Sequence, residues 1–522
     1  MRNDGSNQSG WHRWRVAASA ASILGLCLVL RAYGADDLTR PIRVSPDGHF
    51  LAQPDGSPFF WLGDSALQLF KHLNHEEADL YLQDRAQKGF TVIQAVALGF
   101  NQSKNRDGEV PLVDNDPTRP NERYFANVDW VIDRARHYGL RIAMLPAWGD
   151  KVTGGWAADP QIFTPANARV YGRWLASRYR EKGILWVLGG DTNPLWPERS
   201  LANQFGTANE GVEGRNSPTV IVDYRPIYDA LALGLTEGDG GHPFITYHPT
   251  NSSFSGTADP RTSLYLGDRP WLDMNMLQTG HFADPVHQVF PQIIGLIFSW
   301  KGTTNYEPVN AEYHSTPTRP IVDGETRWED LPINQLKGNA YWTAYDTRNG
   351  AYHAVFAGAA GHNYGNENVA NFFNPAVKPA EEMEWKPWMD ALQSPVSGQL
   401  HFLKDLMLSR PYFTRMPDQS LIAGDQGQGV EHLSATRDGT GQYAMIYLPH
   451  GGDITINLAK LSGSRVRAWW FNPRTGAAAT VERTFSTRRA RAFTSPTQGS
   501  EDDWVLVVDS IGSHFPPPGR EP

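Results

Sequence analysis

Residues 184–193 constrain the fold of this chain more than any other stretch. They read Ile-Leu-Trp-Val-Leu-Gly-Gly-Asp-Thr-Asn, an apolar run that ends at two glycines and Asp191. A strand that is apolar on both faces suits a parallel sheet covered by helices. In an α/β barrel the chemistry lies at the carboxyl ends of the strands, where Asp191 stands. Residues 319–325, Arg-Pro-Ile-Val-Asp-Gly-Glu, have the same form and bring Glu325 to a corresponding position.

Eight strand-like runs recur along the chain, and helical stripes separate them. The stripes begin at caps such as Asn74 and Thr164, and glycines such as Gly89 end them. The expected strands are residues 59–64, 91–98, 140–146, 184–188, 243–248, 272–279, 320–325 and 353–360. This alternation predicts a (β/α)8 TIM barrel. No Gly-x-Gly-x-x-Gly follows the first strand, which argues against a dinucleotide-binding sheet.

Beyond residue 409 the pattern changes to short strands with turn signals and no helical stripes. Such a pattern predicts a small all-β sandwich. We therefore predict an α/β barrel domain at residues 38–409, a β-sandwich domain at 410–511 and a disordered tail at 512–522. A chain of 522 residues is long enough for this division.

Residues 1–34 have the order of a secretory signal peptide. Arg13 and Arg15 precede an apolar run at residues 16–30, and small residues follow up to Ala35. An uncleaved membrane anchor is the alternative, because Arg31 follows the run directly. We expect a periplasmic or secreted bacterial protein.

The overall charge bears on the partners of the protein. A net charge of -9 argues against a nucleic-acid partner, which requires a basic surface. The 18 Trp, 19 Tyr and 23 Phe residues supply flat faces that pack cores and also stack on sugar rings. We expect an oligo- or polysaccharide partner, no cofactor, no metal, and no membrane partner beyond the possible N-terminal anchor. The oligomeric state stays open.

Asp191 and Glu325 suit the hydrolysis of a glycosidic bond. Strands four and seven lie nearly across a barrel from one another, so the two carboxylates can face one pocket. One carboxyl group protonates the leaving oxygen while the other attacks the anomeric carbon, at a separation of about 5 to 5.5 Å for retention and about 6.5 to 9.5 Å for inversion. We assign Asp191 as acid/base and Glu325 as nucleophile. The alternative is that each side chain only caps the helix that follows.

Six further side chains lie at or just past predicted strand ends, where they can bond sugar hydroxyls or stack on rings. These candidate substrate-binding residues are Asp64, Trp148, Asn193, His248, His281 and Tyr364. For each of these residues, the alternative to substrate binding is a structural role in hydrogen bonding or packing. A metal site formed by His248 with Asp64, His281 and His362 is a further alternative, but the first strand lacks the His-x-His of barrel metallohydrolases.

Five strand-end motifs together resemble the apiosidase-like glycoside hydrolases. They are 61–65 (Trp-Leu-Gly-Asp-Ser), 145–149 (Leu-Pro-Ala-Trp-Gly), 189–193 (Gly-Gly-Asp-Thr-Asn), 246–249 (Thr-Tyr-His-Pro) and 322–325 (Val-Asp-Gly-Glu). That family consists of bacterial (β/α)8 enzymes, often followed by a small β-domain named for collagen binding. The resemblance covers residues 41–509. It implies a retaining enzyme with Asp191 as acid/base and Glu325 as nucleophile, acting on plant cell-wall polysaccharide, with apiose-containing pectin side chains as one candidate.

One departure concerns the acid. The larger clan of retaining barrel hydrolases usually has Asn-Glu after strand four, whereas this chain has Gly190-Asp191. Because aspartate is one methylene shorter, its backbone must bring it closer to the substrate. Two other classes remain as alternatives. A catalytically silent carbohydrate-binding or adhesion protein predicts carboxylates too far apart to cooperate, and a metal-dependent barrel hydrolase predicts bound zinc.

Overall fold

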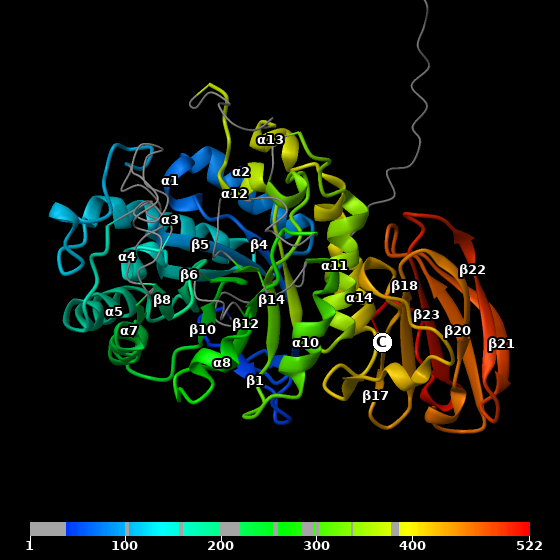
Figure 1. Ribbon diagram of the computed structural model, residues 1–522. Helices are drawn as coiled ribbons and strands as arrows, with labels where there is room; N and C mark the ends of the chain where they lie inside the picture. Colours follow the sequence, from blue (N-terminus) through cyan, green and yellow to red (C-terminus); the bar gives the residue numbers. More distant parts are fainter. Residues whose placement is uncertain are drawn as a thin grey trace, which may run out of the picture.

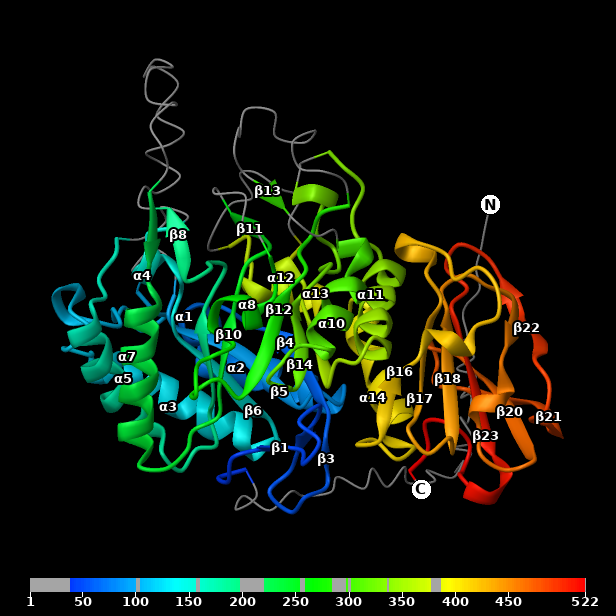
Figure 2. The ribbon, with the colours of Figure 1, turned by 60° about the horizontal axis from the view of Figure 1, so that its bottom comes forward.

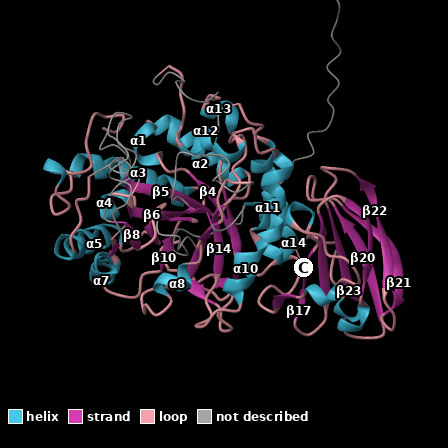
Figure 3. Ribbon diagram, in the orientation of Figure 1, coloured by secondary structure: helices cyan, strands magenta, loops and turns pink. Residues whose placement is uncertain are grey.

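The computed structural model describes residues 38–99, 104–155, 160–197, 220–253, 259–283, 297–298, 302–335, 338–376 and 386–521. The segment predicted to be a signal peptide lies outside them. A closed parallel barrel is followed by an antiparallel β-domain, and the two lie side by side (Figures 1 and 3). The predicted fold class is confirmed. Within the described residues, no helix combines the length and apolar character needed to cross a membrane.

The barrel consists of eight parallel strands, each paired with its neighbours in chain order, and the last pairs with the first. They are β4 (Trp61–Ser65), β5 (Val92–Leu98), β6 (Arg141–Ala147), β7 (Leu185–Gly189), β10 (Ile245–His248), β12 (Met274–Gln278), β14 (Ile321–Glu325) and β15 (Gly361–Tyr364). The longer helices are α2 (His75–Gln87), α3 (Glu122–His137), α5 (Pro165–Tyr179), α7 (Arg225–Asp239), α10 (Tyr306–Tyr313), α11 (Ala344–Phe356) and α14 (Leu400–Leu408).

Shorter elements lie before, between and after the barrel strands. The helices are α1 (Leu69–His72), α4 (Asp150–Thr153), α8 (Thr262–Leu266), α12 (Glu367–Ala370) and α13 (Trp388–Ala391). The strands are β1 (Arg43–Val44), β2 (Leu51–Ala52), β3 (Pro58–Phe59), β8 (Leu195–Pro197), β9 (Ile221–Asp223), β11 (Ser252–Ser253) and β13 (Ile297–Phe298). In Figure 2, β8, β11 and β13 lie above the barrel strands; β11 pairs with β13, and β8 pairs with β9.

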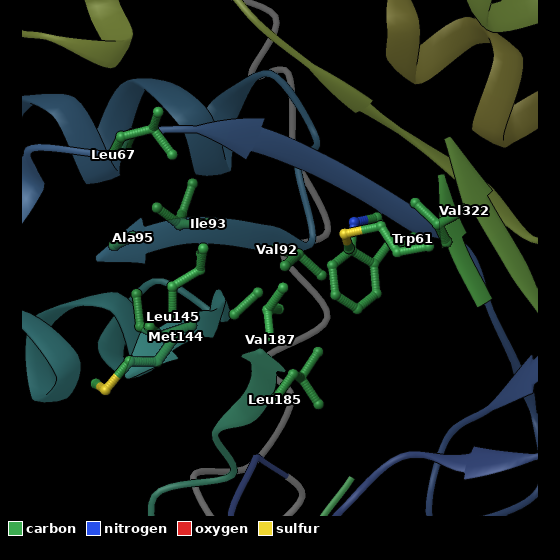
Figure 4. Packing of buried hydrophobic residues seen from close by; sticks show 14 of the residues in the cluster. Trp61, Leu67, Val92, Ile93, Ala95, Met144, Leu145, Leu185, Val187 and Val322 are labelled. Atoms are coloured by element: carbon green, nitrogen blue, oxygen red, sulfur yellow. The ribbon is translucent and has the colours of Figure 1, made fainter. Parts of the chain in front are cut away.

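Alternate residues of the barrel strands point inward and fill the barrel with apolar side chains. Trp61, Val92, Val187 and Val322 belong to this core and lie near one another in Figure 4. The parallel register places His248, at the end of β10, beside Gly189 of β7, so that His248 faces the inside of the barrel. The interior of the barrel is therefore filled mainly by apolar side chains, and Asp191 and Glu325 stand at its carboxyl end.

The predicted eighth strand, residues 353–360, is wrong. Residues up to Phe356 complete helix α11, and the strand is β15, four residues of sequence Gly-His-Asn-Tyr. Nearly all of α11 is buried, so it lacks the polar stripe of an exposed helix. A short apolar run buried on all sides cannot be distinguished from a buried strand by periodicity.

The β-domain is a sandwich, as predicted. Its larger sheet has the order β16-β17-β18-β23-β20-β21, and its smaller sheet pairs β19 with β22. Ile454 and Phe493 of the smaller sheet pack on Ile446 and Leu506 of the larger one. The strands are β16 (Arg415–Pro417), β17 (Ser434–Asp438), β18 (Tyr443–Leu448), β19 (Gly451–Ile456), β20 (Arg465–Phe471), β21 (Ala478–Ser486), β22 (Arg491–Gln498) and β23 (Trp504–Ser510).

The tail predicted to be disordered packs on the protein instead. Arg410 donates to the carbonyl of Pro516 at 3.1 Å, and its guanidinium lies over the ring of Phe515. The backbone N–H of Gly519 donates to the hydroxyl of Ser409 at 3.2 Å. Proline-rich composition therefore misled the prediction, because the tertiary partners of this segment lie about a hundred residues earlier.

The barrel and the β-domain share one hydrophobic core. Helices α11 and α14 lie between them in Figure 1, and the core that contains Trp61 continues to Tyr447 and Val505 of the β-domain. Arg348 of α11 donates twice to Asp503 at 2.8 Å, and both side chains are buried. The β-domain is therefore built into the support of the barrel.

We predict that Arg348→Met destabilises the whole protein by about 3–5 kcal/mol, because it removes both short hydrogen bonds to the buried Asp503 carboxylate and leaves only Arg474, at 3.9 Å, as a cationic partner. Thermal unfolding followed by calorimetry should show one lowered transition. The control is Arg169→Met, whose ion pair with Glu237 is exposed and screened by solvent, and it should leave the transition nearly unchanged. Separate transitions for the two domains, with only one of them shifted, would contradict a shared core.

Candidate active site

Three consecutive residues with left-handed backbone end strand β7 and present Asp191. Their φ angles are 82° at Gly189, 111° at Gly190 and 51° at Asp191. A Cβ at Gly190 would lie 2.8 Å from the ring of Trp148, so a larger residue would clash there. Left-handed backbone is unfavourable for a residue with a Cβ, and aspartate is among the residues that tolerate it. The turn thus holds the short acid in a strained, fixed position.

A β-bulge presents Glu325. In the pairing of β12 with β14, Leu277 lies opposite Asp323 but the next residue, Gln278, lies opposite Glu325, so one extra residue is inserted at Gly324. Asp323 faces the outer helices, where Asn305 donates to it at 3.0 Å. Without the bulge Glu325 would face the same way, two residues further on. The bulge turns its carboxylate into the barrel mouth.

The two carboxylates meet in one site. A carboxylate oxygen of Asp191 lies within 4.8 Å of one of Glu325, and a ring nitrogen of His248 lies within the same distance of both. Gln278 Nε2 donates to Asp191 Oδ1 at 2.6 Å. The side chain of Asp191 is 29% exposed and that of Glu325 is 6% exposed, so a substrate can reach the acid.

Two histidines hold Glu325. His281 Nε2 lies 2.8 Å from Glu325 Oε1, and His248 Nε2 lies 3.3 Å from Oε2. Burial opposes ionisation of Glu325, but the contacts of its carboxylate with the two histidines outweigh burial and lower its pKa. His281 is in turn fixed by an edge-on contact with Trp328, at 5.1 Å between ring centres. Glu325 is therefore an ionised carboxylate aimed by its neighbours.

The environment of Asp191 has the opposite effect. Burial raises the pKa of Asp191 well above its usual value, and the nearby charge of Glu325 raises it further, while the hydrogen bond from Gln278 acts in the other direction. One carboxyl group keeps its proton and the other loses it. Two neighbouring acids whose pKa values are moved apart in this way are the arrangement that acid/base chemistry requires.

Two of the predicted substrate-binding residues point away from the site. Asp64 is buried behind β4, where Tyr81 donates to it at 2.5 Å and Arg85 at 2.6 Å. Tyr364, its register partner on β15, donates to Glu329 at 2.8 Å. Both occupy outward positions of their strands, so the proximity to a strand end was misleading. They connect the sheet to the surrounding elements.

Two other predicted residues are buried at the rim. Asn193 exchanges hydrogen bonds with Thr250, at 3.1 Å in both directions, and so joins the loops after β7 and β10. Trp148 is 1% exposed and lies beneath Gly190, with its ring 6.3 Å from that of His248. In this structure both support the turn that carries the acid, and neither face of the indole is open for stacking on a sugar.

The sequence reasoning missed Gln278 and Glu367. Gln278 is the last inward residue of β12, after Met274 and Met276, and this alternation could have identified it. Glu367 begins helix α12 just past the end of β15, and Asn371 donates to it at 2.8 Å. Burial raises the pKa of Glu367 to about 7, and the charge of Glu325 contributes to that rise. It is a third acid close to the pair.

Asp191, His248 and Glu325 also have the spacing of a possible three-ligand metal site. Of the other ligands considered from the sequence, His281 touches Glu325, but Asp64 is committed to Arg85. His362 pairs in register with Asp323 on the outward side of the sheet. The four-ligand set expected for that alternative therefore does not assemble.

Comparison with known proteins agrees with this geometry. Residues 45–414 match the family model described as "Apiosidase-like, catalytic domain", and residues 416–509 match "Putative collagen-binding domain of a collagenase". A crystal structure from Bacteroides vulgatus, described as a glycoside hydrolase family 5 protein, is 28% identical with a TM-score of 0.77, over 92% of this chain and 95% of that one. A second structure, described as a glycoside hydrolase, is 28% identical with a TM-score of 0.75, over 91% and 98%. No curated protein matches.

The first of these family models covers well over half of the chain, and the same barrel and β-domain order is present in the structure. The protein is a glycoside hydrolase. It belongs to the apiosidase-like family.

Proposed function

We propose that the enzyme cleaves its glycosidic bond with retention of configuration, with Glu325 as nucleophile and Asp191 as acid/base. The observation that carries this proposal is the separation of their carboxylate oxygens, within 4.8 Å. This bound is well below the about 6.5–9.5 Å that leaves room for a water in inverting enzymes, and it favours the shorter spacing, about 5–5.5 Å, of retaining ones.

The chemistry follows from the two protonation states. Glu325 attacks the anomeric carbon as the glycosidic oxygen leaves with the proton of Asp191, which gives a glycosyl ester on Glu325. Asp191 then removes a proton from water, and the resulting attack on the anomeric carbon releases the sugar and restores both carboxyl groups. The histidines that bond Glu325 stabilise it as an anion before attack and as a leaving group afterwards.

The silent binding protein is the less favoured alternative. It predicts carboxylates that are far apart and have ordinary pKa values, whereas the carboxylate oxygens of these two lie within 4.8 Å of one another and their pKa values are moved in opposite directions. For a metal-dependent hydrolase, the spacing of Asp191, His248 and Glu325 is the supporting observation. Dialysis against a chelator distinguishes the metal-dependent hydrolase from the proposed retaining enzyme. The retaining enzyme keeps its full rate after dialysis, because its mechanism uses no metal ion.

We further propose plant cell-wall polysaccharide as the substrate, with apiose-containing pectin side chains as a candidate. The support is membership of the apiosidase-like family. Release of sugar from a panel of pectic and hemicellulosic oligosaccharides tests this proposal. Activity restricted to substrates from outside the plant cell wall would contradict it.

Asp191→Asn should lower kcat by roughly 10²- to 10⁴-fold on substrates with poor leaving groups, because it removes general acid catalysis. Glu325→Gln should abolish turnover, since it removes the nucleophile. Sugar release from the same panel measures both effects, and thermal unfolding checks that the variants fold. The matched control is Glu237→Gln, a surface carboxylate that should have wild-type activity. Equal rates in all variants would contradict the assignment of Asp191 as acid/base and Glu325 as nucleophile.

The pH profile of kcat/KM should be bell-shaped, because the active form has Glu325 ionised and Asp191 protonated. Activity falls as the pH drops through the lowered pKa of Glu325 and as it rises through the raised pKa of Asp191. His281→Ala removes a hydrogen bond that favours the anion, so the acidic limb should move to higher pH. His242→Ala, at an exposed histidine, should leave the profile in place. A profile insensitive to His281 would contradict this role.

We also propose export of the protein to the periplasm or the medium through residues 1–34, on the basis of their charge and apolar pattern. A mature chain beginning at Ala35 is the expected result of N-terminal sequencing after expression in a bacterium. Recovery of the intact chain in the membrane fraction would instead indicate the uncleaved anchor.

A further inference from the structure

We infer that a hollow beside the catalytic carboxylates is a second sugar-binding subsite, which holds one residue of the glycan away from the bond that is cleaved. This inference rests on the proposed function. The hollow is lined by Leu98, Val110, Leu112, Asp114, Asn115 and Lys151, among others. None of these residues was identified from the sequence.

The hollow lies on the same rim of the barrel as Asp191. Leu98 ends β5, and its carbonyl accepts from the N–H of Trp148 at 3.0 Å. Gly149 N–H in turn donates to the carbonyl of Gly190 at 3.2 Å, in the turn that carries the acid. Neighbouring strands lie about 4.8 Å apart, so β5 is on the order of 10 Å from β7. A short oligosaccharide can span that distance.

The size of the hollow suits one sugar residue. Its volume is about 260 Å³, below the roughly 300–1,000 Å³ of pockets that enclose a drug-sized ligand. A single ring fits, but a longer segment of chain would have to leave the hollow. The enzyme therefore binds a defined unit there.

The lining has the mixture of groups that sugars require. Leu98, Val110 and Leu112 form an apolar wall for the C–H face of a ring, and Asp114, Asn115 and Lys151 supply polar groups for hydroxyls. Lys151 is 2% exposed and belongs to helix α4, which begins two residues after Trp148, so its side chain lies in the buried part of the rim. The Asp114 side chain is 77% exposed and pairs with Arg119.

The loop that carries these polar groups is held in a strained conformation. Asp114 and Asn115 both have left-handed backbone, with φ of 52° and 57°. Backbone hydrogen bonds fix the segment on both sides, from Val113 N–H to the carbonyl of Arg119 and from Asn121 N–H to that of Pro111, each at 2.9 Å. Strain of this kind is concentrated at ligand-binding sites. The two side chains are thus presented in place before a ligand arrives.

The test uses Asp114→Asn and Lys151→Met in the full-length enzyme. Asparagine tolerates left-handed backbone, and methionine keeps the packing of the lysine stem. The matched control is Asp107→Asn, an exposed aspartate of the neighbouring loop that does not line the hollow. Kinetics are measured with short and long members of the pectic and hemicellulosic panel, and binding of the same compounds is measured by calorimetry.

Each variant should raise KM for the long oligosaccharides roughly 3- to 10-fold with kcat unchanged, as expected for the loss of one hydrogen bond that acts equally in ground and transition states. The shortest substrates and the control should behave as wild type. Binding by calorimetry should weaken by the same factor.

The outcomes separate the two proposals. Hydrolysis that depends on Asp191 but is insensitive to Asp114→Asn and Lys151→Met at every chain length overturns the subsite alone. Binding that depends on the hollow, without any hydrolysis, supports the subsite and overturns the proposed mechanism. Failure of every long oligosaccharide to bind overturns the subsite.

Discussion

The close approach of a buried carboxyl group, Glu325, and a partly buried one, Asp191, is the constraint on which the site depends. Two ionised carboxylates this near one another repel strongly at low local dielectric, so one must keep its proton. The surroundings determine which one. His248 and His281 contact Glu325 and favour its anion, while burial and the charge of Glu325 favour the protonated form of Asp191. The repulsion between the acids therefore produces two different chemical roles.

Backbone geometry makes this approach possible. A turn of two glycines and an aspartate brings a short acid forward at the end of β7, and a bulge at Gly324 rotates a longer acid inward at the end of β14. The larger clan of retaining barrel hydrolases usually has a glutamate where this chain has Asp191. The path of the main chain thus compensates for the shorter side chain. The left-handed turn and the bulge cost conformational free energy, and the packed barrel beneath them supplies the rigidity that maintains them.

The same rigidity extends to the β-domain. Buried ion pairs fix α11 and the chain after α14 against that domain, and apolar side chains fill the interface continuously with the barrel core. Helix α11 directly precedes β15, the strand that closes the barrel next to the strand of Glu325. The structural role of the β-domain is therefore to support the final part of the barrel, whatever else it binds.

The sequence alone determined the barrel, the sandwich and the strand ends that bear Asp191 and Glu325, because apolar runs closed by glycine and a carboxylate are local signals. It failed at residues 353–360, where burial on all sides removes the helical pattern, and at the tail, whose partners are distant in the chain. Which strand-end side chains point inward was not readable from local patterns. Asp64 and Tyr364 face out while Gln278 faces in, since direction depends on register around a closed barrel and on a single bulge. The separation and opposite pKa shifts of the two acids also belong to the folded state, because they arise from groups that the sequence keeps far apart.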